Sequence, residues 1–226
     1  RLFLYLTVME KTLHIPRLDI PIKSIFCIGR NYSEHAKELG NAVPKEPIVF
    51  LKPLNTICFD GDTISIPSQS KDVHHEVEMV IAIGKTGKNI KQEEALDYIV
   101  GIGVGIDLTA RDIQQKAKEK GLPWAIAKGF DTFAPISEFV PLVEVPSINN
   151  LDLELKVNGQ VRQTGNTLNM IFSCEYLISY LSTIFTLNPG DLIFTGTPKG
   201  VSAIQTGDKI EASLNRNLAN LSLSVE

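Results

Sequence analysis

HEVEMVIAIG, residues 75–84, and YIVGIGVGID, residues 98–107, are the two stretches that decide how this chain folds. Both are rich in β-branched residues, and each predicts an extended strand. On a strand, side chains two positions apart share a face, so Glu76 and Glu78 are expected side by side. Further along the first stretch both faces are apolar, which indicates a strand inside the protein.

The paired glutamates admit two interpretations. Two neighbouring carboxylates on a buried strand repel each other and lose hydration, and a bound divalent cation is the simplest compensation. Alternatively, Glu76 and Glu78 lie in water where the strand reaches the surface. This segment alone leaves both possibilities open.

The second stretch places glycine at every other position. Gly101, Gly103, Gly105 and Asp107 share one face, which is bare until the carboxylate appears at its end. Glycines at this spacing suggest that something approaches the strand closely. We expect the floor of a cavity that ends in a metal-binding aspartate, and the alternative is close packing against another strand.

Together, Glu76, Glu78 and Asp107 predict an all-oxygen metal site. Hard oxygen ligands favour Mg²⁺ or Mn²⁺, with Ca²⁺ possible, and three monodentate carboxylates leave about three octahedral positions open. A bidentate 2-oxo acid and a water molecule suit those positions. His74 and His75 are rival ligands, but imidazole suits this hard set less well, and His75 is expected on the opposite face.

The rest of the chain predicts a β-rich α+β fold. Asn-Gly at 158–159 is a hairpin signal. Three helices are expected, over 31–39 with Asn31 as N-cap and Gly40 as stop, over 109–120, and over 170–182. Further strands are expected at 24–28, 47–51, 63–66, 151–157, 191–195 and 209–214.

Length and composition exclude several classes of protein. The 226 residues are 43% hydrophobic and 21% charged, as in an ordinary globular protein. The net charge of −4 lacks the basic excess of nucleic-acid binders, and no apolar run is long enough to span a bilayer. Three widely spaced cysteines (Cys27, Cys58 and Cys174) predict buried free thiols and a cytoplasmic protein.

We expect one catalytic domain over residues 1–226. Its N-terminal part covers residues 9–60 and includes a lid helix near 31–40. Residues 1–8 are expected to be a non-native or disordered extension, because Met9 looks like a natural start.

The segment GRNYSEHAKELG, residues 29–40, predicts a helix that carries a base. His35 and Glu38 are three positions apart, so they are neighbours on a helix surface, and the carboxylate can orient the imidazole to activate water. The alternative is an exposed helix on which the pairing is incidental. A helix of this kind can act as a lid over a substrate.

Other polar residues follow the glycine strand. Arg111 and Gln114 lie three positions apart on the second expected helix, and Lys128 follows an apolar segment. Thr197 lies in TGTPKG, residues 195–200, a tight loop whose hydroxyl and N–H groups can hold a carboxylate. Each residue is equally compatible with an ordinary surface position.

Taken in order, these motifs resemble the fumarylacetoacetate hydrolase family, in particular its acylpyruvate hydrolase and oxaloacetate decarboxylase branch. The matching segments cover nearly the whole chain from about Cys27 to Asp208. They are GRNYSEHAKELG (29–40), FLKP (50–53), HHEVE (74–78), GIDLTARDIQ (105–114), PWAIAKGFDTFAPI (123–136), VNGQVRQTGNT (157–167) and TGTPKGV (195–201). One departure is the tail, 214–220, where a glycine is expected in the final turn.

The resemblance implies a mixed β-roll or sandwich with few short helices, which usually forms a homodimer. It implies Mg²⁺ or Mn²⁺ on the three carboxylates and a catalytic His35–Glu38 pair on a lid. Lys128 is expected to be catalytic as well, and the substrate to be held by Arg30, Tyr32, Arg111, Gln114 and Thr197.

The function expected from this resemblance is metal-dependent C–C hydrolysis of acylpyruvates to pyruvate and a carboxylic acid. His35 would take a proton from water, and Lys128 or Gln114 would stabilise the oxyanion. The alternative is a lyase or isomerase of related 2-oxo dicarboxylic acids, either an oxaloacetate decarboxylase or tautomerase or a decarboxylase/isomerase of aromatic catabolism. A protein that binds a metal and an organic acid without turnover is the third possibility.

Overall fold

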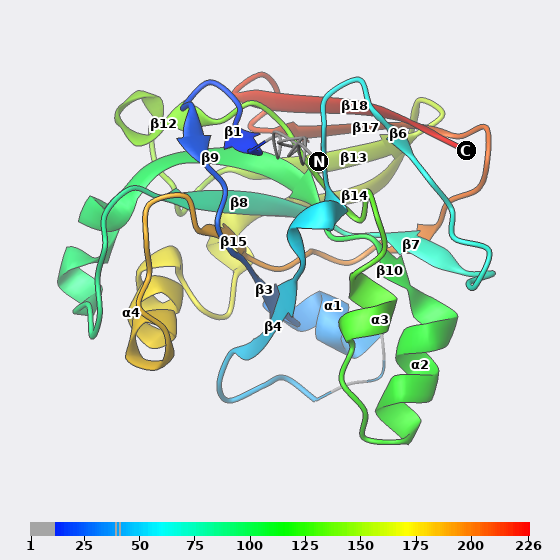
Figure 1. Ribbon diagram of the computed structural model, residues 1–226, viewed down its shortest axis with the longest axis horizontal. Coiled ribbons are helices and arrows are strands. Elements are labelled where there is room, and N and C mark those ends of the chain that lie inside the picture. The colour runs from blue at the N-terminus through cyan, green and yellow to red at the C-terminus, as the bar shows by residue number, and fades with distance from the viewer. Residues whose placement is uncertain (1–11, 39, 41) are drawn as a thin grey trace, which may run out of the picture.

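The computed structural model describes residues 12–38, 40 and 42–226, and most of the regular structure in them is β-sheet (Figure 1). The largest sheet places the two stretches that open the sequence analysis next to each other at its centre. In spatial order its strands are β4 (Ile48–Lys52), β3 (Ile25–Gly29), β15 (Leu192–Phe194), β8 (Val77–Ile83), β9 (Ile99–Ile106), β11 (Ala134–Ile136) and β5 (Ile57–Phe59), and β12 (Val140–Pro141) also pairs with β9.

A second sheet covers one face of β8 and β9, as the upper part of Figure 1 shows. Its order is β14 (Gln160–Asn166), β13 (Asp152–Val157), β17 (Lys209–Leu214), β18 (Ala219–Val225) and β6 (Thr63–Ile64). The other strands of the described residues form two small sheets: one of β10 (Thr109–Ala110), β7 (Val73–His75) and β16 (Ser202–Ala203), and one of β1 (His14–Ile15) and β2 (Ile20–Pro21).

The α-helices are short and lie away from the second sheet. In Figure 1, α1, α2 and α3 gather below the sheets, and α4 lies at one side. Their bounds are α1 (Ser33–Glu38), α2 (Arg111–Glu119), α3 (Ala125–Lys128) and α4 (Cys174–Ile184). In the described part of the chain, four 3₁₀ helices connect other segments: η1 (Leu54–Thr56), η2 (Gln92–Tyr98), η3 (Leu142–Glu144) and η4 (Thr167–Asn169).

Strand β8 is buried on both faces, as its sequence predicts, because it separates two hydrophobic cores. Val77 and Met79 belong to the larger core beneath the second sheet, whereas Val80 and Ala82 belong to a smaller core on the opposite face. Glu76 and Glu78 precede Val80 and Ala82, so the carboxylates are at the end of the smaller core.

The glycines of β9 do not form a cavity floor, and that expectation was wrong. A Cβ atom on Gly105 would come within 2.7 Å of Val80, and one on Gly103 within 3.0 Å of the Phe139 ring. Neither glycine lines the cavity that contains Asp107. The alternating glycines therefore allow neighbouring side chains to pack tightly on the strand.

Several ends of elements differ from the sequence expectations. Asn31 is no N-cap: α1 begins at Ser33, while the buried Asn31 amide binds backbone groups of Phe172 and Thr195. The turn between β17 and β18 forms without a glycine because Asn215 and Arg216 adopt φ values of 47° and 61°.

Other expectations are confirmed or stay open. Cys27, Cys58 and Cys174 are free and buried. Within the described ranges, no helix combines the length and the apolar character needed to cross a membrane. The expected extension at residues 1–8, the start at Met9 and the helix end at Leu39 lie outside the described residues. The single catalytic domain and the homodimer stay predictions.

Candidate functional site

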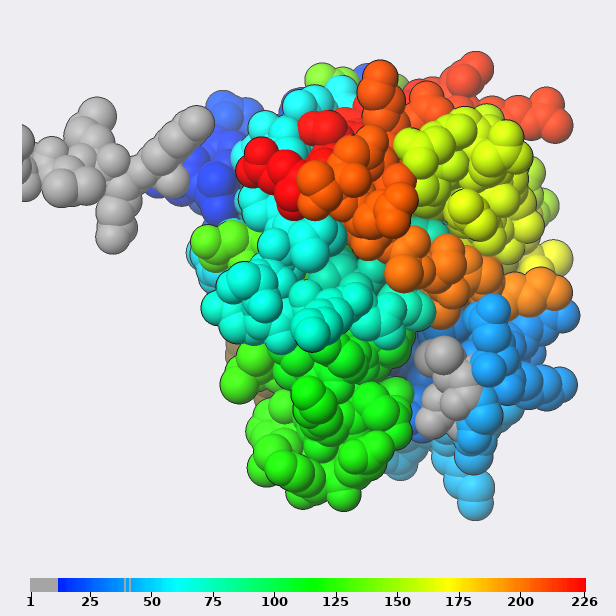
Figure 2. Space-filling model, turned by 90° about the vertical axis from the view of Figure 1, so that its right-hand side faces the viewer, coloured from blue at the N-terminus to red at the C-terminus, as the bar shows by residue number. Residues whose placement is uncertain are grey.

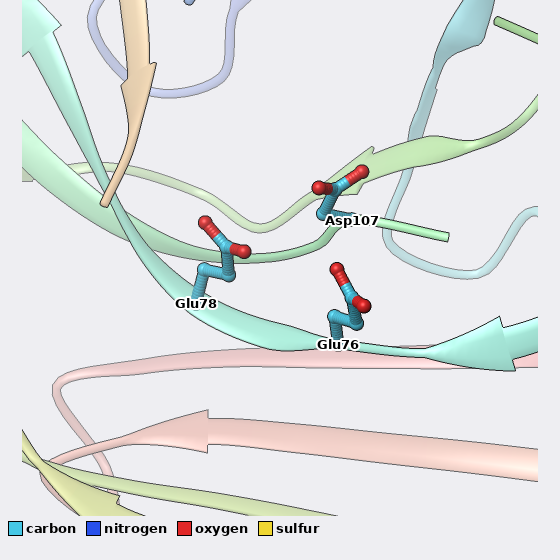
Figure 3. A group of neighbouring side chains, drawn as sticks. All are labelled: Glu76, Glu78 and Asp107. Carbon is cyan, nitrogen blue, oxygen red and sulfur yellow. The ribbon is translucent and has the colours of Figure 1, made fainter. Parts of the chain in front are cut away.

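Glu76 lies at the point where the chain passes from β7 to β8. This break interrupts the single strand that the sequence predicts, but it keeps the two glutamates together. The backbone carbonyl of Glu76 accepts a hydrogen bond of 2.8 Å from Asp107 N–H, which fixes the ends of β8 and β9 to each other. In Figure 3, Glu76, Glu78 and Asp107 point into a common space.

The three carboxylates form a compact, buried group. One ligand oxygen from each residue lies within 4.8 Å of the others. Glu76 is 5% exposed, and Glu78 and Asp107 are each 1% exposed. The alternative of two solvated glutamates at the surface is therefore wrong, and the carboxylates need compensating charge inside the protein.

Three cations supply part of this compensation. Lys128 Nζ lies 2.8 Å from Glu76 Oε2 and 2.6 Å from Asp107 Oδ2. Lys52 Nζ pairs with the other Asp107 oxygen at 2.5 Å, and Arg111 pairs with Glu76 Oε1. Burial alone lowers the pKa of Lys128, but Asp107 and Glu76 raise it above its usual range, so the ammonium stays charged. Burial alone raises the pKa of Glu76, but Lys128 and Arg111 lower it well below its usual range.

Glu78 has a different environment from the other two carboxylates. Its Oε2 accepts a hydrogen bond of 2.7 Å from Gly196 N–H. Within the described residues Glu78 forms no ion pair, unlike Glu76 and Asp107. Burial and the nearby charges of Asp107 and Glu76 raise the pKa of Glu78 well above its usual range. A divalent cation would reverse this penalty, because it would pair with the ionised form.

The donor set fits Mg²⁺ or Mn²⁺. All three ligands are carboxylate oxygens, which hard divalent cations prefer. Each carboxylate oxygen has more than one acceptor site, so the ion pairs with lysine and arginine leave room for a metal bond. The two histidines are occupied elsewhere: His75 binds Gln163 and Ser202, and His74 pairs with Asp72 at 2.9 Å. His75 thus lies away from the carboxylates, as predicted.

The carboxylates line a cavity between the sheet and the helices. Arg30 and His35 line it from the α1 side, and Arg111, Gln114 and Lys118 line it from α2. In Figure 2 the lower part of the face shows α2 (green) beside the segment that carries α1 (blue). Two segments that are far apart in the sequence thus form facing walls.

His35 is the buried base candidate in this cavity. Its Nδ1 lies 3.5 Å from Glu38 Oε2, and only 4% of its side chain is exposed. Burial lowers the pKa of His35, whereas Glu76 and Glu38 raise it and Arg111 lowers it further; the net shift is downward. Both Glu38 oxygens accept from Gly200 N–H at 3.1 Å, which connects α1 to the loop after β15. The imidazole is therefore neutral near pH 7 and able to take a proton.

The remaining predicted residues fall into two groups. Arg30, Arg111, Gln114 and Thr197 line the cavity with the carboxylates, and Arg111 donates to Gln114 Oε1 at 2.7 Å. Tyr32 does not line this cavity: its hydroxyl is buried without a hydrogen-bond partner in the described part of the chain.

Sequence reasoning missed three polar residues of the site. Lys52 lies in FLKP and is 4% exposed, although lysine at a strand end usually reaches solvent. Gln163 is the one fully buried residue of the otherwise accessible β14. Lys118 lines the cavity from the last turn of α2. Only the spacing of Lys118, four residues after Gln114, could have indicated its position on the same helix face.

Comparison with known proteins gives consistent matches. Residues 24–225 match the family model described as fumarylacetoacetate (FAA) hydrolase C-terminal. The chain is 50% identical to oxaloacetate tautomerase FAHD1, mitochondrial, of Arabidopsis thaliana over 89% of this chain and 90% of that protein. It is 48% identical to the mitochondrial oxaloacetate decarboxylase of Dictyostelium discoideum over 85% of this chain and 88% of that protein.

A solved structure extends this likeness to three dimensions. Fumarylpyruvate hydrolase from Pseudomonas aeruginosa, crystallised with Mn²⁺ and pyruvate, superposes with a TM-score of 0.88 and 38% identity. The match covers 95% of this chain and 94% of that one. The expected β-rich fold with few short helices is thereby confirmed. The location predicted for this chain, cytoplasmic, differs from the mitochondrial location in the relatives' names and stays a prediction.

Proposed function

Because the chain belongs to the fumarylacetoacetate hydrolase family, we propose that it is a divalent-metal enzyme acting on small 2-oxo acids. Oxaloacetate is the substrate that we propose first, with tautomerisation and decarboxylation as the reactions. The observation that supports this proposal is the buried group of Glu76, Glu78 and Asp107 in a cavity with a charged Lys128.

The residues that line the cavity would have different roles in the reaction. Glu76, Glu78 and Asp107 would hold Mg²⁺ or Mn²⁺, which supplies Lewis acidity to the 2-oxo group when bound. Lys128 places a permanent positive charge where negative charge develops on the substrate. Arg111 fixes the Gln114 carbonyl oxygen, so the Gln114 amide nitrogen remains a donor for a substrate oxygen.

The rim of the cavity favours a substrate with two carboxylates. Arg30 and Lys118 both line it, and neither has a carboxylate partner within residues 12–38, 40 and 42–226. Each side chain is partly buried, and burial lowers the pKa of both, with Arg30 and Arg111 adding to the effect at Lys118. A second carboxylate at the far end of the ligand would relieve this concentration of positive charge. Oxaloacetate has that carboxylate, whereas acetylpyruvate has a neutral acyl group there.

Neutral His35 gives the site its base. In tautomerisation it would remove a proton from C3 of the 2-oxo acid, and the electron pair of that bond would pass toward the C2 oxygen. In decarboxylation the C3–C4 bond breaks instead, CO₂ leaves, and the same electron flow follows.

Acylpyruvate hydrolysis is the second candidate activity, and the His35–Glu38 pair favours it. Hydrolysis needs a base that takes a proton from water, and Glu38 can orient the imidazole for that step. The resulting hydroxide would attack the distal carbonyl, and cleavage of the C–C bond would release pyruvate and a carboxylic acid.

The proposed function is tested by supplying oxaloacetate or acetylpyruvate to the protein with Mg²⁺ or Mn²⁺. With oxaloacetate, a loss of the enol absorbance and no formation of pyruvate indicates tautomerisation, whereas release of pyruvate indicates decarboxylation. Glu76→Ala, which removes one metal ligand, is expected to abolish each activity. Full turnover by the chelator-treated protein would contradict the metal site, and no turnover of either compound would favour a protein that only binds metal and acid.

The substrate class has its own test. Lys118→Met and Arg30→Gln are expected to raise the KM for oxaloacetate about tenfold, since each removes one charge-assisted contact worth about 1.5 kcal/mol. The KM for acetylpyruvate should change less than threefold. Equal effects on both substrates would contradict a second carboxylate site at the rim.

A further inference from the structure

Gln163 connects the end of the metal-binding strand to the loop that carries Thr197. Its side chain is 1% exposed, and its two ends contact different segments. Oε1 lies 2.7 Å from His75 Nδ1 and 3.1 Å from Val77 N. Nε2 lies 2.8 Å from Thr197 Oγ1 and 2.9 Å from the carbonyl oxygen of Pro198.

A bulge in β14 accounts for this inward position. Leu155 pairs with Gln163 and the next residue, Lys156, pairs with Val161, so Arg162 is the extra residue on β14. Bulges change the direction of a side chain relative to a regular strand. Leu155 faces the core, and Gln163 opposite it does the same on a strand that is mostly accessible.

The two backbone contacts determine which end of the amide is oxygen. A backbone N–H can only donate, so the atom facing Val77 N must be the oxygen. A backbone carbonyl can only accept, so the atom facing Pro198 must be the nitrogen. The orientation of the Gln163 amide thus follows from its neighbours rather than from an arbitrary choice between two flips.

This orientation fixes the hydrogen bonds of the next two side chains. Nε2 donates to Thr197 Oγ1, so the threonine oxygen is an acceptor there and its own proton must point elsewhere. On the other side, His75 Nδ1 must carry a proton, and His75 Nε2 accepts from the Ser202 hydroxyl at 2.9 Å.

We propose that Gln163 is a positioning residue that presets the Thr197 hydroxyl as a hydrogen-bond donor toward an anionic ligand oxygen in the cavity. Thr197 lines the cavity with the three carboxylates, and its loop is held close to β14, where a Cβ on Gly200 would meet the Arg162 carbonyl oxygen at 2.3 Å. This close approach holds the loop against β14, and the hydrogen bond from Gln163 leaves the Thr197 hydroxyl proton to point away from residue 163. The ligand is the 2-oxo acid carboxylate, and this part of the inference rests on the proposed function.

Gln163→Glu is the informative substitution because it keeps the shape of the side chain and replaces the amide nitrogen, a donor, with a carboxylate oxygen, an acceptor. A carboxylate still accepts from Val77 and His75, but it cannot donate to Thr197, whose hydroxyl would then donate to residue 163 and turn away from the cavity. The probe is oxalate, an unreactive dicarboxylate, binding to the Mn²⁺-loaded protein. We expect about a tenfold weaker Kd in Gln163→Glu and in Thr197→Val, and a Kd near that of the wild type in Thr197→Ser.

A double-mutant cycle separates positioning from general structural damage. If Gln163 acts through Thr197, the substitution Gln163→Glu has little further effect in the Thr197→Val background. Mn²⁺ affinity should stay within about twofold in each variant. Additive losses, or an unchanged oxalate Kd in Gln163→Glu with normal oxalate binding by the wild type, would overturn the inference and leave the proposed function intact.

A second measurement needs neither a substitution nor a ligand. Nitrogen-15 NMR of the histidine side chains in the wild-type protein should show His75 protonated on Nδ1 and unprotonated on Nε2. The opposite tautomer would require the Gln163 amide to be flipped, which would overturn the inference. Loss of oxalate binding in the wild type combined with the expected tautomer would count against the proposed function and support the amide orientation.

Discussion

Lys128 Nζ lies 2.6 Å from Asp107 Oδ2, and both residues of this buried ion pair line the cavity. The second oxygen of Asp107 pairs with Lys52, whose ammonium also donates to the carbonyl oxygens of Leu108 and Phe133. Asp107 therefore has one lysine on the cavity side and one on the protein side. The two lysines neutralise the same carboxylate, but only Lys128 lines the space that a substrate would enter.

This difference predicts that the two lysines can be separated by substitution. Lys128→Met and Lys52→Met should each lower the free energy of unfolding by about 3 kcal/mol or more, because each leaves a buried carboxylate with one partner fewer. With saturating metal, Lys128→Met should lower kcat at least about a hundredfold, whereas Lys52→Met should stay within about tenfold of the wild type. Thermal unfolding and steady-state kinetics measure the two effects. Equal losses of kcat would assign both lysines a structural role.

Glu78 provides a prediction in which removing a charge stabilises the metal-free protein. Its folded pKa is raised, so its ionised form costs stability at pH values above the ordinary pKa of about 4.5, and this cost disappears as the pH falls. Glu78→Gln keeps an acceptor for Gly196 N–H without the charge. In chelator at pH 7.5 the variant should have a higher Tm than the wild type, and the difference should shrink toward pH 5.

Added metal should reverse this order of stability. The wild type should gain about 2.7 kcal/mol at a Mn²⁺ concentration one hundred times its Kd, and Glu78→Gln should gain much less because one ligand is impaired. A lower Tm of Glu78→Gln in chelator would show that Glu78 is not destabilising, and an undiminished Mn²⁺ shift would exclude it as a ligand.

The pH dependence of turnover should report the state of His35. A base works only when neutral, and burial lowers the pKa of His35 below its ordinary value of 6.5, so kcat/KM should decline only below that pH. Glu76 and Glu38 raise this pKa and Arg111 lowers it; Glu38 is on α1 with His35, whereas Glu76 and Arg111 belong to neighbouring segments. Glu38→Gln removes one of the groups that raise the pKa of His35. The acid limb of the kcat/KM profile should therefore move to lower pH, and the plateau value of kcat/KM should fall.

Glu34→Gln is the matched control for the pH profile. Glu34 is on the same helix but is exposed and pairs with Lys199 at 3.0 Å, outside the cavity. Its profile should overlay that of the wild type. An acid limb that stays in place in Glu38→Gln, or moves to higher pH, would contradict the role of Glu38 as the partner of His35.

The sequence predicts the grouping of the three carboxylates well because its signal is local. Glu76 and Glu78 are two residues apart, and Asp107 ends the neighbouring strand, so strand periodicity and pairing bring them together. The same periodicity predicts that both faces of β8 are buried. It cannot tell whether the bare face of β9 opens to a cavity or packs against side chains, which depends on Phe139 and Phe194 from distant segments.

The residues that were missed depend on contacts between distant segments. Lys52 is buried because β4 ends beside the carbonyl of Phe133 and the carboxylate of Asp107. Gln163 is inward because of a bulge that no spacing in the sequence announces. Asn31 looks like an N-cap but binds the backbone at Phe172, 141 residues away. In each case the polar side chain follows its partners rather than its local pattern.

Gly196 combines a special backbone conformation with a contact to Glu78, one of the three clustered carboxylates. Its φ is +100°, a Cβ there would lie 2.6 Å from Asn31 Cβ, and its N–H donates to Glu78. Gly207 has a similar φ of +94° with open space around it. Both Gly196→Ala and Gly207→Ala should lower stability by roughly 1–2 kcal/mol through backbone strain, with a further loss from the clash in Gly196→Ala. Only Gly196→Ala should also weaken Mn²⁺ binding, by about tenfold, because Glu78 loses its fixed position. Titrations that show equal Mn²⁺ affinities for the two variants would mean that the loop does not position Glu78 for the metal.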